Sequence, residues 1–138
     1  MNIKFDIEGG NFSSAGLASS EVKRLLKQLN IDIKTIKRLV VAMYEAEVNV
    51  VAHAYQGEAD VDINEDHIKV VFTDHGPGIS DIEQAMQKGY STASDQVREM
   101  GFGAGMGLPN IESHADKLNI TSEVGKGTRV EIICYLNT

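Results

Sequence analysis

Several residue types that mark particular classes of protein are missing or rare in this sequence. Tryptophan is absent, and the single cysteine, Cys134, cannot form a disulfide within the chain. Cys134 alternates with Val130 and Ile132 along a predicted strand, so we expect it to be buried. No apolar run approaches the roughly 20 residues of a membrane helix, and the N-terminus has no apolar signal region. These absences predict a cytoplasmic protein that does not enter a membrane.

Basic residues are also scarce. The chain has 13 Lys and Arg against 20 Asp and Glu, which gives a formal net charge of -7. Non-specific binding of nucleic acid relies on Lys and Arg that neutralise phosphates, so this balance argues against a nucleic-acid partner. A local pocket can still be positive in an acidic protein, and a nucleotide ligand is therefore compatible with the charge. The length of 138 residues predicts one domain, residues 1–138, with one hydrophobic core.

The order of the predicted elements indicates an α+β fold. Apolar residues that alternate predict strands, and a period near 3.6 residues predicts helices. Ser19 or Ser20 is expected to cap the first helix, and Gly57 to end the second. The pattern predicts a two-layer α/β sandwich, with a mainly antiparallel sheet covered on one face by helices. In chain order, the elements are a strand over 3–7, helices over 21–29 and 33–55, a hairpin over 61–72, a helix over 81–88, a lid over 90–100, a helix over 110–117 and a hairpin over 118–134.

Glycine, in contrast, is concentrated in short runs. One run follows Asp74, and in another, over 101–108, every second residue is glycine. Clustered glycines mark a backbone that bends or closely approaches a ligand, and phosphate is a common ligand of this kind. A spacing of two excludes the P-loop and the dinucleotide-binding fingerprint, and the segment 125–128 also fails the P-loop pattern. The signatures of eukaryotic-type kinases are absent as well, so a different nucleotide pocket is required.

The longest predicted helix carries three polar residues on nearly one face. Glu45, Asn49 and His53 follow one another at intervals of four residues. A carboxylate there can act as a general base, and an amide oxygen can ligate Mg²⁺, which prefers hard oxygen donors. Asp74 ends a predicted strand, where a buried aspartate can accept a hydrogen bond from an adenine amino group. The hydroxyl of Thr128 can support that aspartate.

These features together resemble a known superfamily. Four motifs, in order and at the right intervals, resemble the N, G1, G2 and G3 boxes of the GHKL (Bergerat-fold) ATPases. They are Glu45-x-x-x-Asn49-x-x-x-His53, Asp74-x-Gly76-x-Gly78, Gly103-x-Gly105-x-Gly107-Leu108 and Gly125-x-Gly127-Thr128. Within the superfamily, the segments 74–79, 89–92 and 105–109 are most similar to the anti-sigma-factor serine/threonine kinases, especially the stressosome switch-kinase branch. The resemblance covers roughly residues 35 to 135.

The resemblance implies ATP and Mg²⁺ as cofactors and a role for each motif. Glu45 is expected to orient or deprotonate the attacking hydroxyl as the catalytic residue, and Asn49 to bind Mg²⁺. Asp74 is expected to bind adenine, with Thr128 as its hydroxyl partner. The other residues expected at the ATP site are His53, Gly76, Gly78, Ile79, Arg98, Gly101, Gly103, Ala104, Gly105, Met106, Gly107 and Leu108.

Some of these residues have more particular expected roles. Gly76 and Gly78 would let the chain pass close to adenine. The glycines at 103, 105 and 107 resemble the hinge of an ATP lid, and Arg98 is a candidate γ-phosphate contact. A structural, hydrogen-bonded role for His53 is favoured over a catalytic one.

Three functions are compatible with this resemblance. The first is a serine/threonine kinase that phosphorylates a STAS-domain antagonist protein in a partner-switching pathway. A sigma factor is a further expected partner, and homodimerisation is considered because relatives often dimerise. The second is a nucleotide-gated module that sequesters a sigma factor or another regulator without significant phosphotransfer. The third is a detached histidine-kinase catalytic domain that acts in trans.

Overall fold

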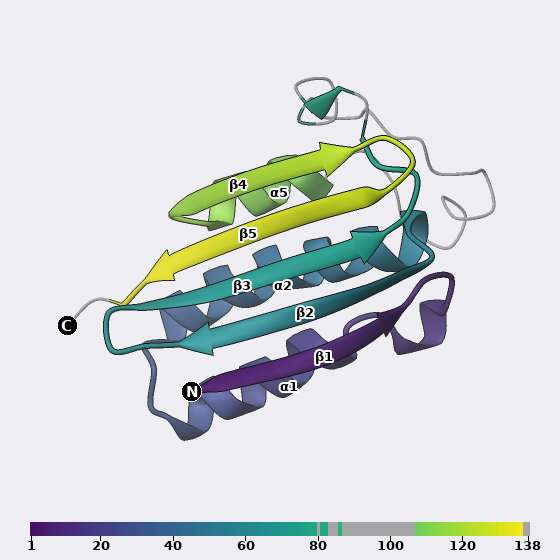
Figure 1. The fold of residues 1–138 in the computed structure, drawn as a ribbon. Helices are drawn as coiled ribbons and strands as arrows, with labels where there is room; N and C mark the ends of the chain where they lie inside the picture. The colour runs from purple at the N-terminus through teal and green to yellow at the C-terminus, as the bar shows by residue number, and fades with distance from the viewer. Residues whose placement is uncertain (80, 83–85, 87–106, 137–138) are drawn as a thin grey trace.

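The computed structural model describes residues 1–79, 81–82, 86 and 107–136, which form one antiparallel sheet and the helices beside it (Figure 1). The strand order is β1-β2-β3-β5-β4. The strands are β1 (Asn2–Glu8), β2 (Gln56–Ile63), β3 (His67–His75), β4 (Lys117–Glu123) and β5 (Gly127–Tyr135). The helices are α1 (Leu17–Gln28), α2 (Ile33–His53) and α5 (Gly107–His114), and a single 3-10 turn, η1, spans Phe12–Ser14.

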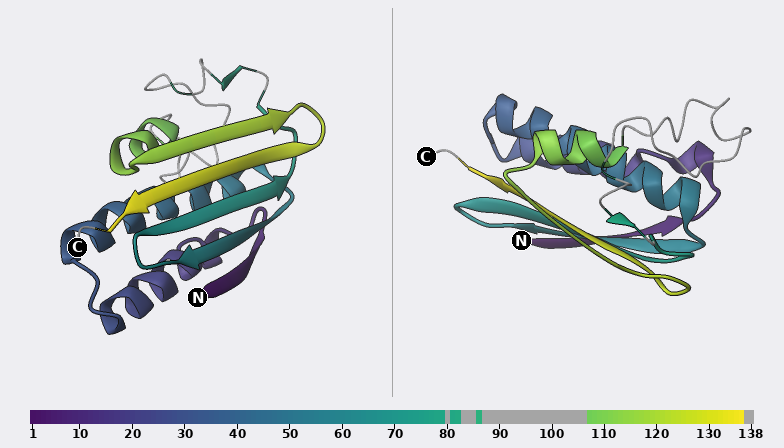
Figure 2. Two further views of the ribbon diagram at one scale, coloured as in Figure 1. Left: turned by 60° about the vertical axis from the view of Figure 1, so that its left-hand side comes forward. Right: turned by 90° about the horizontal axis from the view of Figure 1, so that it is seen from above.

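The three helices lie on one face of the sheet, and no described element covers the other face (Figure 2). Apolar side chains from the inner positions of the strands and from α1, α2 and α5 form one core between these two layers. Cys134 is among them, with no exposed surface, as expected. The predicted two-layer sandwich is therefore confirmed. The largest fully buried side chains are Phe72, Leu26, Ile36, Leu39, Met43, Ile68, Ile111 and Ile132.

The start of α1 differs from the sequence prediction. The helix begins at Leu17, so Ser19 and Ser20 lie inside it and do not cap it. The backbone N–H groups of its first turn have no partner within the helix and donate instead to the carboxylate of Glu47, which comes from α2. A cap supplied by a side chain 28 residues away leaves no local signal, which explains why the prediction was wrong.

Three other helix boundaries were also placed wrongly. Helix α2 ends at His53, and Gly57 lies within β2 rather than ending the helix. Helix α5 begins at Gly107 and ends at His114, three residues before each predicted boundary. Just after this helix, the carboxylate of Asp116 binds Arg38 of α2 at 2.8 Å and accepts the backbone N–H of Tyr135 at 2.7 Å.

The predicted helix over 81–88 and the predicted lid over 90–100 lie largely or wholly outside the described residues. Among the residues that are described, no helix has both the length and the apolar character needed to cross a bilayer.

Candidate nucleotide-binding site

Two segments that are distant in the sequence meet where β3 and α2 end. The backbone N–H of Tyr55, just after α2, donates to the carbonyl of His75 at 2.8 Å. Gly57 pairs with Asp74 across β2 and β3, and a Cβ atom on Gly57 would lie 2.6 Å from Cγ1 of Val50. Gly57 therefore makes room for α2 to pack closely against the sheet. This packing brings Asp74 beside Val50, the neighbour of Asn49 in α2.

Asp74 lies on the helix-covered face of the sheet and is half-buried. Burial raises the pKa of its carboxyl, while a backbone hydrogen bond from Thr128 and the nearby charge of His75 act in the opposite direction. The N–H of Thr128 reaches Oδ1 of Asp74 at 3.0 Å. No other hydrogen bond from the described residues reaches the carboxylate. Its second oxygen, Oδ2, could therefore accept one from a ligand.

The hydroxyl of Thr128 has a different partner from the one that the sequence suggested. It lies 2.9 Å from Oγ of Ser122, whose hydroxyl donates to the carbonyl of Gly127 at 3.0 Å. A serine hydroxyl has one hydrogen, so the Thr128 hydroxyl is the donor to Ser122. Ser122 Oγ also accepts the N–H of Ile79 at 2.7 Å. Ser122 thus joins the segment after β3 to the hairpin of β4 and β5.

Gly76 and Gly78 are held against the rest of the protein. The N–H of Gly76 donates to the carbonyl of Lys126 at 3.1 Å, and the N–H of Gly125 donates to Pro77 at 2.9 Å. Gly78 has a φ of +75°, and a Cβ atom there would collide with the backbone carbonyl of Glu123. Packing within the protein already explains why these positions are glycine, and the expected approach to adenine remains a prediction.

Glu45 lies at the contact between α2 and α5. It is half-buried, and burial raises the pKa of its carboxyl. The polar side chain of Asn110 in α5 and the nearby charge of His114 both act in the opposite direction. A carboxyl group with a raised pKa is better suited to accept a proton than one exposed to water.

Asn49 and His53 continue the same face of α2 at intervals of one turn, and both are partly exposed. Burial lowers the pKa of His53, so its neutral form is favoured. The face therefore presents a carboxylate, an amide and a neutral imidazole in a row. The carboxylate oxygens of Glu45 and the amide oxygen of Asn49 are both hard donors of the kind that Mg²⁺ prefers.

Only two residues of the glycine-rich part of the predicted site, Gly107 and Leu108, are among the described residues. Arg98, Gly101, Gly103, Ala104, Gly105 and Met106 lie outside the described residues. Gly107 is the first residue of α5, and Leu108 is buried in the core with 8% of its surface exposed. The roles of these residues in a hinge and in phosphate binding remain predictions.

The residues that are described fit a magnesium nucleotide. Asp74 offers a free carboxylate oxygen to an amino group, and Asn49 offers an amide oxygen to a cation. Within the described part of the chain, no three His, Cys, Asp or Glu side chains gather into a metal site. A cation at Asn49 would accordingly take its other ligands from phosphates and water, as Mg²⁺ commonly does.

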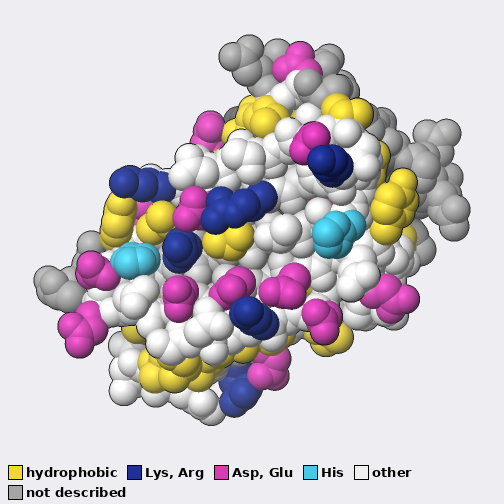
Figure 3. All heavy atoms as spheres, viewed as in Figure 1, with side chains coloured by type: hydrophobic (Ala, Val, Ile, Leu, Met, Phe, Trp, Pro, Cys, Tyr) yellow, Lys and Arg dark blue, Asp and Glu magenta, His cyan; other side chains and the backbone are white. Residues whose placement is uncertain are grey.

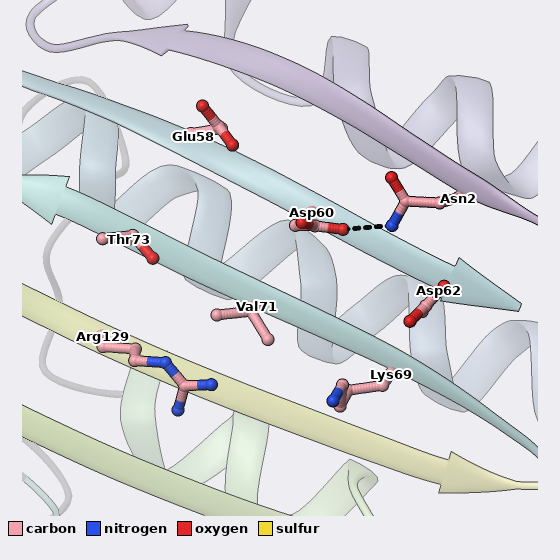
Figure 4. Close-up of a pocket in the computed structure, with 8 residues that line it drawn as sticks. All are labelled: Asn2, Glu58, Asp60, Asp62, Lys69, Val71, Thr73 and Arg129. Carbon is pink, nitrogen blue, oxygen red and sulfur yellow. Dashed lines mark hydrogen bonds between the residues drawn. The ribbon is translucent and has the colours of Figure 1, made fainter.

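The open face of the sheet has a different character. Figure 3 views this face and shows charged side chains of both signs spread across it. A shallow hollow here lies on the other side of the sheet from α2 and α5, so it is separate from the candidate site (Figure 4). It is lined by Asn2, Glu58, Asp60, Asp62, Lys69, Val71, Thr73 and Arg129.

Sequence reasoning missed three residues of the site. Ser122 alternates with Leu118 and Ile120, and a polar residue on the inner face of a strand was a signal that it has a partner. Asn110 follows the glycine run, and an amide in the first turn of a helix is only a weak signal of a functional residue. Gly57 had an equally plausible local explanation as the end of a helix.

Comparison with known proteins shows which family and which solved structure this chain resembles. Residues 13–134 match the model of the histidine kinase-like ATPase domain. An anti-sigma F factor of Clostridium beijerinckii is 34% identical, with 96% of this chain and 91% of the relative covered. The serine/threonine-protein kinase RsbT of Bacillus subtilis is 28% identical, with 83% of each chain covered. A solved structure of the RsbU and RsbW domains of Rv1364c from Mycobacterium tuberculosis shares the fold, with a TM-score of 0.66, 14% identity, and coverage of 99% of this chain and 32% of that one.

Proposed function

Since the chain belongs to the histidine kinase-like ATPase family, in the branch that includes the anti-sigma F factors, we propose that it is an ATP- and Mg²⁺-dependent serine/threonine protein kinase. Its proposed substrate is a STAS-domain antagonist protein of a partner-switching pathway, and its second proposed partner is a sigma factor. We propose that it acts in the cytoplasm as a single domain spanning residues 1–138.

The observation that carries this proposal is the position of Glu45. Its half-buried carboxylate lies one helical turn from Asn49, on the face of α2 that packs against α5. A general base and a cation-binding amide are thereby held close together, and phosphoryl transfer requires little more than positioning and charge neutralisation. ATP and Mg²⁺, when bound, supply the phosphoryl group and neutralise its charge.

Each residue has a defined task in this proposal. Asp74 binds the adenine amino group through Oδ2, and Asn49 holds the cation. Glu45 orients the acceptor hydroxyl and takes its proton as the oxygen–phosphorus bond to the acceptor forms. The bond between that phosphorus and the bridging oxygen of ADP breaks, so ADP leaves with the electron pair. The products are a phosphoserine or phosphothreonine, ADP and a proton on Glu45.

The test is transfer of labelled phosphate from ATP-Mg²⁺ to STAS-domain proteins of the source organism. We expect an acid-stable phosphoprotein with the wild-type chain and none with Glu45→Gln. Glu112→Gln removes an exposed carboxylate from α5 and serves as the matched control. Acid-labile phosphate on the acceptor would instead indicate a histidine kinase, because phosphohistidine is hydrolysed in acid.

The second candidate is a nucleotide-gated binding module. The relatives named anti-sigma F factor favour a role in capturing a partner. If this alternative is correct, Glu45→Gln retains ATP-dependent capture of the partner, Asp74→Asn loses it, and no phosphoprotein forms with either protein.

A further inference from the structure

Ser122, Thr128 and Asp74 form a row across three adjacent strands, β4, β5 and β3 (Figure 1). Ser122 pairs with Thr128, and the backbone N–H of Thr128 donates to Oδ1 of Asp74 at 3.0 Å. Alternation with the buried Phe72 and Val130 places the side chains of Asp74 and Thr128 on the helix-covered face of the sheet. Ser122 shares this face because directly paired residues do. Thr128 therefore lies between Ser122 and the proposed adenine contact.

The hydroxyl of Ser122 uses all of its hydrogen-bonding capacity within the protein. Its oxygen accepts the backbone N–H of Ile79 at 2.7 Å, and its hydrogen is donated to the carbonyl of Gly127 at 3.0 Å. The remaining contact, 2.9 Å from the hydroxyl oxygen of Thr128, must consequently be donated by Thr128. The hydrogen of the Thr128 hydroxyl is thus directed to β4, away from Asp74, and its unused lone pairs can only accept.

Asp74 and Thr128 accordingly offer acceptors to a purine base. An ionised carboxylate cannot donate, and the Thr128 hydroxyl has already used its one hydrogen. Adenine carries an amino group at position 6, which donates, whereas hypoxanthine and guanine carry a carbonyl oxygen there, which accepts. An acceptor placed against another acceptor gains no hydrogen bond and leaves both groups unpaired, so the pair of side chains favours a 6-amino purine.

We propose that Ser122 is a specificity-determining residue for the nucleotide. By holding the hydrogen of the Thr128 hydroxyl towards β4, Ser122 keeps that hydroxyl an acceptor beside Asp74 and so favours a 6-amino over a 6-oxo purine. Without Ser122, the Thr128 hydroxyl is free to rotate and to donate, either to a 6-oxo group or to the carboxylate of Asp74. This inference rests on the proposed function only in placing the purine base at Asp74.

The binding test compares ATP with inosine triphosphate, which has an oxygen in place of the amino group. Titration calorimetry gives the Kd of each nucleotide. In Ser122→Ala, the preference for ATP should fall about 3- to 10-fold, which corresponds to one neutral hydrogen bond. Ser122→Thr retains the hydroxyl and should keep the wild-type preference. Thr121→Ala alters an exposed neighbour on β4 and should also match the wild type. An unchanged preference in Ser122→Ala would overturn the proposal.

A double-mutant cycle separates this role from a general effect on packing. Thr128→Val removes the hydroxyl and keeps the backbone N–H that binds Asp74. In this background, Ser122→Ala should leave the preference for ATP unchanged, because Ser122 acts through the Thr128 hydroxyl. A further change as large as that seen in the wild-type background would show that Ser122 acts by another route, and would also overturn the proposal.

A second readout requires no nucleotide. In the free protein, the pKa of Asp74 followed by carboxyl-carbon NMR should fall in Ser122→Ala, because the released Thr128 hydroxyl can donate to the carboxylate. It should stay the same in Thr121→Ala. An unchanged Asp74 titration in Ser122→Ala would overturn the proposed orientation of the Thr128 hydroxyl, even in a protein that binds ATP. A lowered pKa in a chain that binds no nucleotide would keep that orientation and reject the proposed function.

Discussion

The backbone N–H of Thr128 donates to Oδ1 of Asp74 at 3.0 Å and so joins the first residues of β5 to the end of β3. The contact is close because Gly127 has no side chain, and a Cβ atom there would collide with the Asp74 carbonyl. One carboxylate oxygen thereby accepts a hydrogen bond from the protein, and no described residue donates a hydrogen bond to the other. Asp74 is consequently both a structural link and the proposed adenine contact.

Asp74→Asn should weaken ATP binding and leave the fold intact. The asparagine oxygen can still accept the Thr128 N–H, but an NH₂ group then replaces Oδ2 and cannot accept from adenine. Loss of one hydrogen bond to a charged group corresponds to roughly a 10- to 100-fold weaker Kd, measurable by titration calorimetry. Asp62→Asn, on the open face of β2, is the control and should bind ATP normally. Equal affinity in Asp74→Asn would reject the adenine assignment.

The raised pKa of Asp74 makes a prediction about pH and stability. Burial raises this pKa above its value in the unfolded chain, so between the two values the folded protein binds more protons than the unfolded one. The contribution of Asp74 to the free energy of unfolding therefore falls as the pH rises through that window. Above that window the buried carboxyl is charged, and its desolvation costs stability. Asp74→Asn should accordingly have a higher Tm than the wild type at pH 7, and the gain should shrink at pH 4.

Thermal unfolding of both proteins at several pH values measures this difference. Glu45→Gln should behave in the same way, because burial raises the pKa of Glu45 too. Lower stability of both variants at neutral pH would show that these carboxylates stabilise the fold instead of serving a ligand.

Glu47 should be essential for stability. Only 2% of its surface is exposed, and it accepts hydrogen bonds from the N–H groups of Gly16, Ala18 and Ser19 at 2.9–3.1 Å and from the Ser19 hydroxyl at 2.6 Å. Glu47→Ala leaves buried donors without an acceptor, so we expect a loss of about 3 kcal/mol or more in urea unfolding. Glu21→Ala removes an exposed carboxylate from a surface ion pair with Arg24 and should change the midpoint little.

Two glycines with similar positive φ angles should differ in their tolerance of alanine. Gly78 has a φ of +75° and Gly10 a φ of +80°, which both disfavour a side chain. A Cβ atom on Gly10 meets nothing within 4 Å, whereas one on Gly78 collides with Glu123. Gly10→Ala should cost about 1 kcal/mol and Gly78→Ala distinctly more, measured by chemical unfolding. Equal losses would mean that the hairpin of β4 and β5 can move away from Gly78.

The local sequence pattern was sufficient to predict helices and strands whose formation depends on neighbouring residues. The alternation at Ile68, Val70 and Phe72 predicted β3, and the apolar period around Leu39 and Met43 predicted α2 to within two residues at its end. Four motifs in order, including those at Glu45 to His53 and Asp74 to Gly78, indicated the family, because these residue types carry the chemistry. Such features depend on backbone periodicity and on side-chain chemistry, and both can be read in the sequence.

Contacts between distant segments were decided only in the tertiary structure. Glu47 replaced the predicted serine cap of α1, Gly57 made room for Val50 rather than ending α2, and the backbone rather than the hydroxyl of Thr128 bound Asp74. The sequence by itself indicated which of the described helices and strands form, and which residues are candidates to bind a nucleotide. Which donor meets which acceptor depends on how α2, α5 and the two hairpins pack, since a hydrogen bond requires two groups to lie within about 3 Å of each other.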